Sequence, residues 1–405
     1  MPIPPQVQPL EPTDLEAAWQ GLELAFGGAA HPADRAVELA LIARSRAYAA
    51  YDAGTPVATA GAFDLELTVP GAVLPVAGVT WVSVQPTYRR RGLLRALMDR
   101  QLSDLHEAGT AVAALWAAEG AIYQRFGYGL ASLHLTLEVP RGAAFSRPVR
   151  PDGLRLQPAD PAVLGPVHDV VAARTPGWHR RDAPWWDYRL HDPDHRRAGQ
   201  SPLRCLLAEG PDGPDGYALF ATTQDSEEGM AAGVVHLREL AATTPEAAAR
   251  MWRFLLDLDL TRRVEASKCP LDEPLLHLLA EPRAAHARVR DGLWVRLVDV
   301  GAALEARRYA APVDVVLDVG DPTCPWNAGR WHLSGGPDGA TCSRTSQDPE
   351  LRLGAAELGA TYLGGPSLTA LAGAGRVDEL RPGALAPAST ALGWGGPAPY
   401  APMVF

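Results

Sequence analysis

The sequence has 405 residues, of which 47% are hydrophobic and 21% charged, and its formal net charge is −10. This length and composition predict a folded protein of two or three domains and exclude a disordered chain. The acidic balance argues against a general nucleic-acid surface, which needs basic patches. It fits a cationic substrate, because an acidic cleft concentrates positive ligands, although an acidic surface also serves solubility alone.

Two further features narrow the class of protein. No apolar run is long enough to span a membrane, and the first residues lack the layout of a secretory signal, so we expect a cytoplasmic protein without membrane contact. The sequence has four cysteines without CxxC spacing, at Cys205, Cys269, Cys324 and Cys342. This scatter favours reduced thiols and indicates neither a metal site nor a disulfide framework.

The first segment, residues 1–148, mixes helices with a β-rich meander. Thr13 and Glu16 have the spacing of a capping box at the start of the first helix. Hydrophobic periodicity predicts helices at 13–26, 32–45, 92–107 and 120–125, and strands at 47–51, 55–67, 78–84, 111–116 and 131–139. A stretch rich in proline and arginine, residues 140–154, marks the boundary.

The second segment, residues 149–300, loosely repeats this order of elements. We expect helices at 162–174 and 245–257 and strands at 203–208, 216–222, 233–241 and 293–297. It has no basic glycine-containing loop before its later helix, as in a degenerate second copy. The third segment, residues 301–405, alternates strands with turns rich in glycine and proline and ends in proline-rich coil. It has no catalytic motif, so we expect a scaffold or oligomerisation role.

A loop in the first segment is the most informative part of the sequence. A predicted strand ending near Val84 is followed by a cluster of arginines, by Gly92, and by a helix. The N-terminus of a helix presents unpaired N–H groups and a positive dipole, and this combination binds pyrophosphate. Because basic side chains oppose that dipole, their presence there calls for a compensating anion. The single glycine excludes both the GxxxxGK[ST] and the GxGxxG phosphate loops.

This loop resembles the Q/R-x-x-G-x-G/A signature of the GNAT superfamily of N-acetyltransferases, with Arg89, Gly92 and Leu94 at its positions. Leu94 departs from the usual small residue. Residues 82–95 and 119–129 are similar to the Eis (enhanced intracellular survival) branch of that superfamily. The resemblance covers the whole chain, most strongly its first 140 residues.

The resemblance implies an α+β fold of two tandem GNAT units followed by a sterol-carrier-protein-like domain. The domains would be 1–148, binding acetyl-CoA, 149–300, a degenerate second unit, and 301–405. It implies an acetyl-CoA-dependent N-acetyltransferase that acts on primary amines, notably on aminoglycosides at several positions, as in antibiotic resistance. It also implies a homohexamer. Alternatives are a polyamine or protein-lysine acyltransferase and a non-catalytic CoA-binding scaffold.

In this family one strand diverges from its neighbour, and its free backbone groups pair with pantetheine and the acetyl carbonyl. The resemblance therefore assigns cofactor-binding backbone groups to Val82, Ser83 and Val84. It assigns phosphate contacts to Arg89, Arg90, Arg91, Gly92, Leu93, Leu94 and Arg95.

Acetyl transfer to an amine needs a donor for the leaving thiolate and a base for the ammonium proton. Tyr123 matches the catalytic tyrosine of the family, with Tyr128 as a rival donor and ordinary packing as the alternative. No His/Asp pair stands out as the base. The resemblance implies the terminal carboxylate of Phe405, which requires the tail to fold back onto the first unit, and Glu119 is the fallback.

The substrate pocket is the least defined part of the prediction. Phe26, Trp81 and Glu119 are its candidate lining residues, and the two aromatic side chains are equally suited to a core.

Overall fold

The structure is a computed structural model that describes residues 6–28, 31–227 and 229–405. It divides into two compact units, each built from separate stretches of the chain. Unit 1 joins the N-terminal stretch up to Ser132 to Leu293–Gly396 and Val404–Phe405, and unit 2 joins Leu133–Gly292 to Pro397–Met403. Among the described residues, no helix is both long and apolar enough to cross a membrane.

The first part of unit 1 is a seven-stranded sheet with the strand order β1-β2-β3-β4-β5-β16-β6. Its strands are β1 (Val7–Pro9), β2 (Arg46–Asp52), β3 (Thr55–Val69), β4 (Ala72–Val84), β5 (Val112–Trp116), β16 (Leu293–Leu297) and β6 (Gly129–Leu130). All neighbours pair antiparallel except β4 and β5, which run parallel. Parallel neighbours need a crossover connection, and the helix α3 (Leu93–Glu107) provides it.

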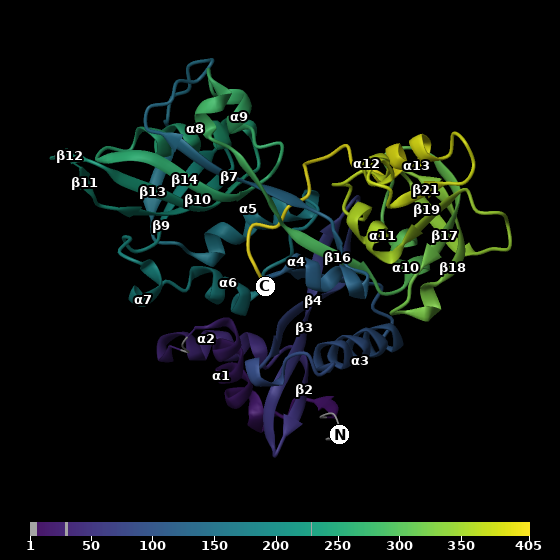
Figure 1. Cartoon of the computed structure of the whole chain (residues 1–405). Coiled ribbons are helices and arrows are strands. Elements are labelled where there is room, and N and C mark those ends of the chain that lie inside the picture. The colour runs from purple at the N-terminus through teal and green to yellow at the C-terminus, as the bar shows by residue number, and fades with distance from the viewer. Residues whose placement is uncertain (1–5, 29–30, 228) are drawn as a thin grey trace. The chain divides into compact units, whose positions relative to one another are not determined.

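Helices cover both faces of this sheet. The helices α1 (Leu15–Phe26) and α2 (Pro32–Ile42) lie on one side of β2–β4 and α3 lies on the other (Figure 1). On the α1 side, Trp19 and Ile42 pack with Trp81 in a small buried cluster. The expected capping box is wrong: a 3-10 turn, Pro12–Asp14, leads into α1, whose N-cap makes no side-chain hydrogen bond. The proline at the start of that turn pre-sets the backbone instead.

The second part of unit 1 is a five-stranded sheet with the order β19-β18-β17-β20-β21 and four helices. Its elements are α10 (Val300–Ala306), β17 (Val313–Gly320), β18 (Gly329–Gly336), β19 (Gly339–Arg344), β20 (Leu351–Gly354), α11 (Ala355–Thr361), α12 (Leu368–Gly373), β21 (Val377–Glu379) and α13 (Leu385–Leu392). Glycines let α11 approach the first sheet, because a Cβ on Gly359 would lie 2.1 Å from the Val295 carbonyl oxygen. The helix α13 occupies sequence that was expected to be coil, and it tolerates Pro387 because that residue falls in its first turn.

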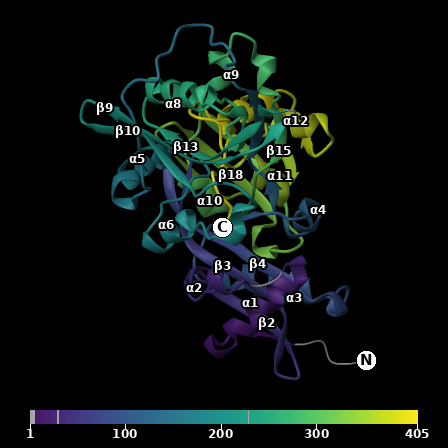
Figure 2. The same ribbon diagram turned by 90° about the vertical axis from the view of Figure 1, so that its left-hand side faces the viewer.

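Unit 2 has a seven-stranded sheet with the order β15-β7-β14-β13-β10-β9-β8. Its strands are β7 (Leu133–Pro140), β8 (Leu154–Gln157), β9 (Arg204–Gly210), β10 (Gly213–Thr223), β13 (Gly233–Ala242), β14 (Thr261–Cys269) and β15 (Arg288–Asp291), beside a small hairpin, β11 (Ser226–Glu227) and β12 (Met230–Ala231). Its helices are α5 (Pro161–Arg174), α6 (Ala183–Leu190), α7 (Asp194–Arg197), α8 (Pro245–Asp257) and α9 (Leu275–Leu278). The helices α8 and α5 cover opposite faces of this sheet (Figure 2). Because β13 and β14 are parallel and joined through α8, unit 2 repeats the β4–α3–β5 arrangement of unit 1.

The last strand of each repeat pairs with the sheet of the other repeat. The strand β7 was expected to belong to the first segment, yet it pairs with β14 and β15 in unit 2. The strand β16 was expected to belong to the second segment, yet it pairs with β5 and β6 in unit 1. The existence of both strands is confirmed, but alternation predicts that a strand forms and not which partner it takes. The expected domain limits at 148/149 and 300/301 stay predictions.

Candidate active site

The strands β4 and β5 diverge in the middle of the first sheet. Their parallel pairing runs from Val76 opposite Val112 to Val79 opposite Leu115 and ends there. From Thr80 to Val84, β4 pairs only with β3 on its other side. The backbone groups of this stretch that face β5 are therefore left for another partner, in the strand where Val82, Ser83 and Val84 were predicted to bind the cofactor.

A β-bulge bends β4 at the divergence. Two residues of β4, Trp81 and Val82, oppose Ala60 alone on β3, and Trp81 has a φ of 52°. A bulky residue rarely adopts this conformation, and the surroundings must hold it there. Thr59 does so, because its hydroxyl donates to the Trp81 carbonyl oxygen over 2.8 Å and lies 2.9 Å from the Ser83 hydroxyl. The bulge changes the direction of the end of β4. Thr59 was not predicted as a site residue, because a single threonine in a strand carries no signal in the sequence.

The loop after β4 ends in an open helix N-terminus. Arg90 and Gly92 have φ values of 63° and 83°, and Gly92 is the N-cap of α3 without a side-chain cap. In the part of the chain that the structure describes, the N–H groups of residues 90–95 donate to no protein acceptor. Apart from its chain neighbours, none of the described residues has an atom within 4 Å of the position that a Cβ of Gly92 would take. An anion can therefore approach these N–H groups directly, which is the geometry predicted for a pyrophosphate.

The arginine side chains divide into two groups. Arg89 donates to the carbonyl oxygens of Val84 and Ala25, so it ties the loop to the end of α1. Arg91 donates to the Thr87 carbonyl oxygen over 2.8 Å. Arg90 and Arg95 are exposed, and the Arg95 guanidinium lies 5.9 Å from the centre of the Phe126 ring. These two residues are therefore best placed to add charge to the anion site.

Tyr123 ends the short helix α4 (Gly120–Tyr123), which follows β5. Its side chain is buried in the core cluster that contains Val79 and Leu115, the last paired residues before the divergence. Burial, together with the charge of Glu119, raises the pKa of Tyr123 to about 12. Tyr128, the rival donor, is fully buried, and its hydroxyl has no hydrogen-bond partner among the described residues.

The remaining predicted site residues lie in different surroundings. The Phe405 ring packs against β4, since a Cβ on Gly78 would lie 3.1 Å from its Cδ2 atom, one residue before the strands diverge. Glu119 is exposed at the start of α4, and Phe26 is exposed at the end of α1. Trp81 is buried with Trp19, which favours a core role, and its assignment to the substrate pocket stays a prediction.

Three comparisons with known proteins agree with this geometry. Models of the acetyltransferase (GNAT) domain match residues 6–131 and 177–297, and a sterol carrier protein domain matches residues 300–402. The chain is 46% identical to an uncharacterized N-acetyltransferase of Streptomyces avermitilis over 95% of this chain and 96% of that protein. It is 36% identical to the N-acetyltransferase Eis of Mycobacterium tuberculosis, over 78% of this chain and 77% of that protein.

The chain belongs to the Eis-like GNAT N-acetyltransferases. Its fold is that of Eis1 from Mycobacterium abscessus, with a TM-score of 0.85 at 34% identity, and the match covers 99% of this chain and 100% of that one. This confirms the predicted α+β fold of two GNAT units followed by a sterol-carrier-protein-like domain. The protein is thus an acetyltransferase, and acetyl-CoA is its co-substrate.

Only the first GNAT unit of this Eis-like enzyme has an open helix N-terminus at the matching position. In unit 2 the equivalent helix, α8, begins at Pro245, and the Thr244 side chain caps it by accepting from the Ala247 N–H. Glu246 adds a negative charge to its first turn. A capped and acidic helix start does not attract phosphate, so the lack of a basic loop noted in the sequence has a structural counterpart. No cluster of residues suited to hold a metal ion occurs in the described parts of the chain.

Proposed function

We propose that this enzyme acetylates primary amines of cationic acceptors, with aminoglycosides modified at several positions as the leading class. The observation that carries the proposal is the divergence of β4 from β5, because it lies between an uncapped basic helix start and the buried Tyr123. An acyl-CoA can lie along such a strand with its pyrophosphate on the helix. The same place then receives the attacking amine.

The reaction moves one acetyl group. The amine nitrogen attacks the thioester carbonyl carbon, a C–N bond forms, and the C–S bond breaks. With a pKa of about 10 the amine is an ammonium ion near neutral pH, and it must lose one proton to expose the lone pair that attacks. The nitrogen loses a second proton after the C–N bond has formed, and the departing sulfur takes up one proton to give the CoA thiol. Free backbone N–H groups of β4 would donate to the carbonyl oxygen as it gains charge.

Tyr123 would donate to the departing sulfur. With a pKa of about 12 its phenol stays protonated at neutral pH. A thiol has a reference pKa of about 8.5, so full proton transfer from this phenol is uphill when the thiolate is solvated. The pKa of about 12 for the phenol already includes burial, whereas the thiol value of about 8.5 refers to water. Burial in the same site also raises the thiol pKa, so the difference between the two pKa values is smaller there. The hydrogen bond itself stabilises the sulfur as charge develops.

The Phe405 α-carboxylate would accept the amine proton, directly or through water. The packing of its ring against Gly78 supports this role, because Gly78 is next to the last paired residue of β4. An α-carboxylate has a reference pKa of about 3.5 and becomes a stronger base when it is desolvated. Glu119 remains the alternative base, and its exposure near Tyr123 also suits it to attract a cationic acceptor.

An acceptor screen tests the proposed substrate class. CoA thiol release would be measured with a panel of aminoglycosides, polyamines and lysine peptides, each beside the Tyr123→Phe variant. Turnover with aminoglycosides, and more than one acetyl group per molecule by mass spectrometry, supports the proposal. Turnover confined to polyamines or lysine peptides contradicts aminoglycosides as the acceptor class and names the alternative. Tight acetyl-CoA binding with no turnover would instead indicate a CoA-binding scaffold.

The assembly and the location belong to the same proposal. We propose a cytoplasmic homohexamer that binds neither nucleic acid nor membranes. Light scattering coupled to size-exclusion chromatography measures the mass of the assembly, and a mass other than that of six chains contradicts it.

A further inference from the structure

The segment that carries Tyr123 rests on two side chains of β16. It runs from Gly120, where α4 begins, to Gly127, which ends the following 3-10 turn with a φ of 81°. A Cβ on Gly120 would lie 2.6 Å from the Trp294 ring, and a Cβ on Gly127 would lie 2.7 Å from Nη1 of Arg296. Glycine is therefore required at both positions, because the tyrosine segment approaches these two β16 side chains too closely for a Cβ atom. The segment thus packs directly on β16.

The Arg296 guanidinium is held by the sterol-carrier-protein-like part of unit 1. Arg296 has no exposed surface, and its Nη2 atom lies 2.5 Å from Oδ2 of Asp321, which is also buried. A buried guanidinium stays charged, so this carboxylate is the group that compensates it. Asp321 belongs to the loop Asp321–Asn327, which follows β17 and which we call the brace loop.

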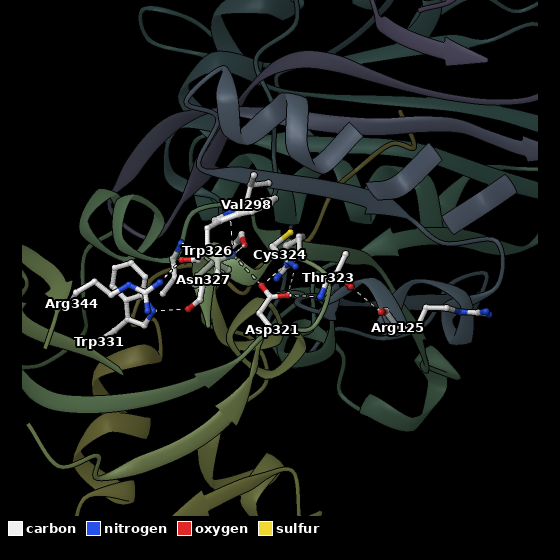
Figure 3. A network of polar contacts seen from close by, with 12 residues as sticks. Arg125, Val298, Asp321, Thr323, Cys324, Trp326, Asn327, Trp331 and Arg344 are labelled. Atoms are coloured by element: carbon white, nitrogen blue, oxygen red, sulfur yellow. Dashed lines mark hydrogen bonds and ion pairs between the residues drawn. The ribbon is translucent and has the colours of Figure 1, made fainter. Parts of the chain in front are cut away.

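Hydrogen bonds hold the brace loop together, and one of its residues makes a second contact with the tyrosine segment (Figure 3). Oδ1 of Asp321 accepts from the Cys324 N–H over 2.9 Å, and Oδ2 accepts from Nδ2 of Asn327 over 3.0 Å. The side chain of Asn327 in turn donates to the Val298 carbonyl oxygen, just beyond β16. The Thr323 hydroxyl donates to the Arg125 carbonyl oxygen, two residues after Tyr123, over 3.3 Å.

We propose that Asp321 and Arg296 are positioning residues for acetyl transfer, through which the sterol-carrier-protein-like part of the chain holds the Tyr123 hydroxyl in place. The proposal rests on the proposed role of Tyr123. Neither residue touches the reacting atoms, and both act through the glycine turn beneath the tyrosine. A catalytic group displaced by about 1 Å can lose on the order of 100-fold in rate, so a loosened brace lowers kcat.

The test compares Asp321→Asn with Glu239→Gln in steady-state kinetics. Glu239 is an equally buried carboxylate in unit 2, paired with Arg181 at 2.8 Å, so it controls for the loss of a buried charge pair. In Asp321→Asn the new amide N–H2 group faces hydrogen-bond donors that the carboxylate accepted from, so the contact is lost. This variant should lower kcat by about 10- to 100-fold, while KM for acetyl-CoA changes less than about twofold. Glu239→Gln should lower stability without this loss of kcat, and Asp321→Glu, which keeps the charge, should regain part of the rate.

A double-mutant cycle separates this proposal from the role of Tyr123. If Asp321 acts through Tyr123, Asp321→Asn adds little further loss in a Tyr123→Phe background. If the two substitutions lower kcat by fully additive amounts, or if Asp321→Asn leaves kcat unchanged, the positioning role of Asp321 is rejected while the role of Tyr123 stands. If Tyr123→Phe alone leaves kcat unchanged, Tyr123 is not the general acid, and the positioning role proposed for Asp321 is rejected with it.

A milder variant keeps the test available if Asp321→Asn does not fold. Thr323→Val removes one hydrogen bond at a partly exposed position and should lower kcat by about two- to fivefold with acetyl-CoA binding unchanged. Wild-type kcat in that variant contradicts the second contact of the brace.

Discussion

Glu273 allows a quantitative prediction about unit 2. Its carboxyl group is buried in the turn between β14 and α9 and accepts from the Trp252 indole N–H over 3.0 Å. Burial raises the pKa of Glu273 from 4.5 to about 7. Between these values the unfolded chain releases a proton that the folded chain keeps, so this group destabilises the fold as pH rises from about 4.5 to about 7. A difference of about 2.5 pKa units corresponds to about 3 kcal/mol of unfolding free energy.

The variant Glu273→Gln isolates this contribution, because the amide keeps an oxygen for Trp252 and does not ionise. We expect it to gain up to about 3 kcal/mol on the wild type between pH 5 and pH 8 in urea unfolding. Burial lowers the pKa of His179 to about 3, and this group contributes a pH dependence of the opposite sign in both proteins. The stability difference between variant and wild type cancels that contribution and is therefore the quantity to compare. The exposed Glu246→Gln serves as control. A constant difference between variant and wild type across this range would show that Glu273 does not titrate there.

Three further predictions concern the active site. Tyr123→Phe should lower kcat by about 100-fold with KM for acetyl-CoA unchanged in the thiol-release assay, and an unchanged kcat removes it as the acid. A short tag added after Phe405 should abolish most turnover but leave acetyl-CoA binding by calorimetry intact, and full activity excludes its carboxylate as the base. Arg90→Gln should weaken acetyl-CoA binding by about tenfold at low salt and by less at high salt. The control Arg147→Gln, also at an exposed arginine, should leave the affinity unchanged, and equal effects of the two variants contradict a local phosphate contact.

The phosphate loop could be predicted from the sequence because its causes are local. The strand ending at Val84, the arginine cluster, the single Gly92 and the amphipathic helix lie within a few residues of one another, and each residue type has a conformational preference. The positive φ of Gly92 is the outcome expected from glycine at that position. Periodicity and composition divided the chain into three segments, and the resemblance that this loop carries identified them as two GNAT units and a sterol-carrier-protein-like domain.

Features that depend on distant contacts could not be read from the pattern. The bulge at Trp81 depends on Thr59 of the neighbouring strand, and nothing near Trp81 indicates a positive φ. Arg296 lies in a strand that reads as a buried apolar segment, so its ion pair with Asp321 has no local signal. The helix α13 lies in sequence expected to be coil, and the single-turn helix α7 was not predicted, because short helices near prolines give little periodicity.

The exchanged strands have a consequence for biosynthesis. The sheet that carries the acetyl-CoA site cannot be completed until β16 has been made, after nearly all of unit 2. Until then the edge of β5 lies open, and an open strand edge pairs readily with other chains. The sheet of unit 2 needs only strands between Leu133 and Gly292, so it can form as that stretch emerges, whereas the acetyl-CoA-binding sheet must wait until unit 2 has been made and β16 follows it.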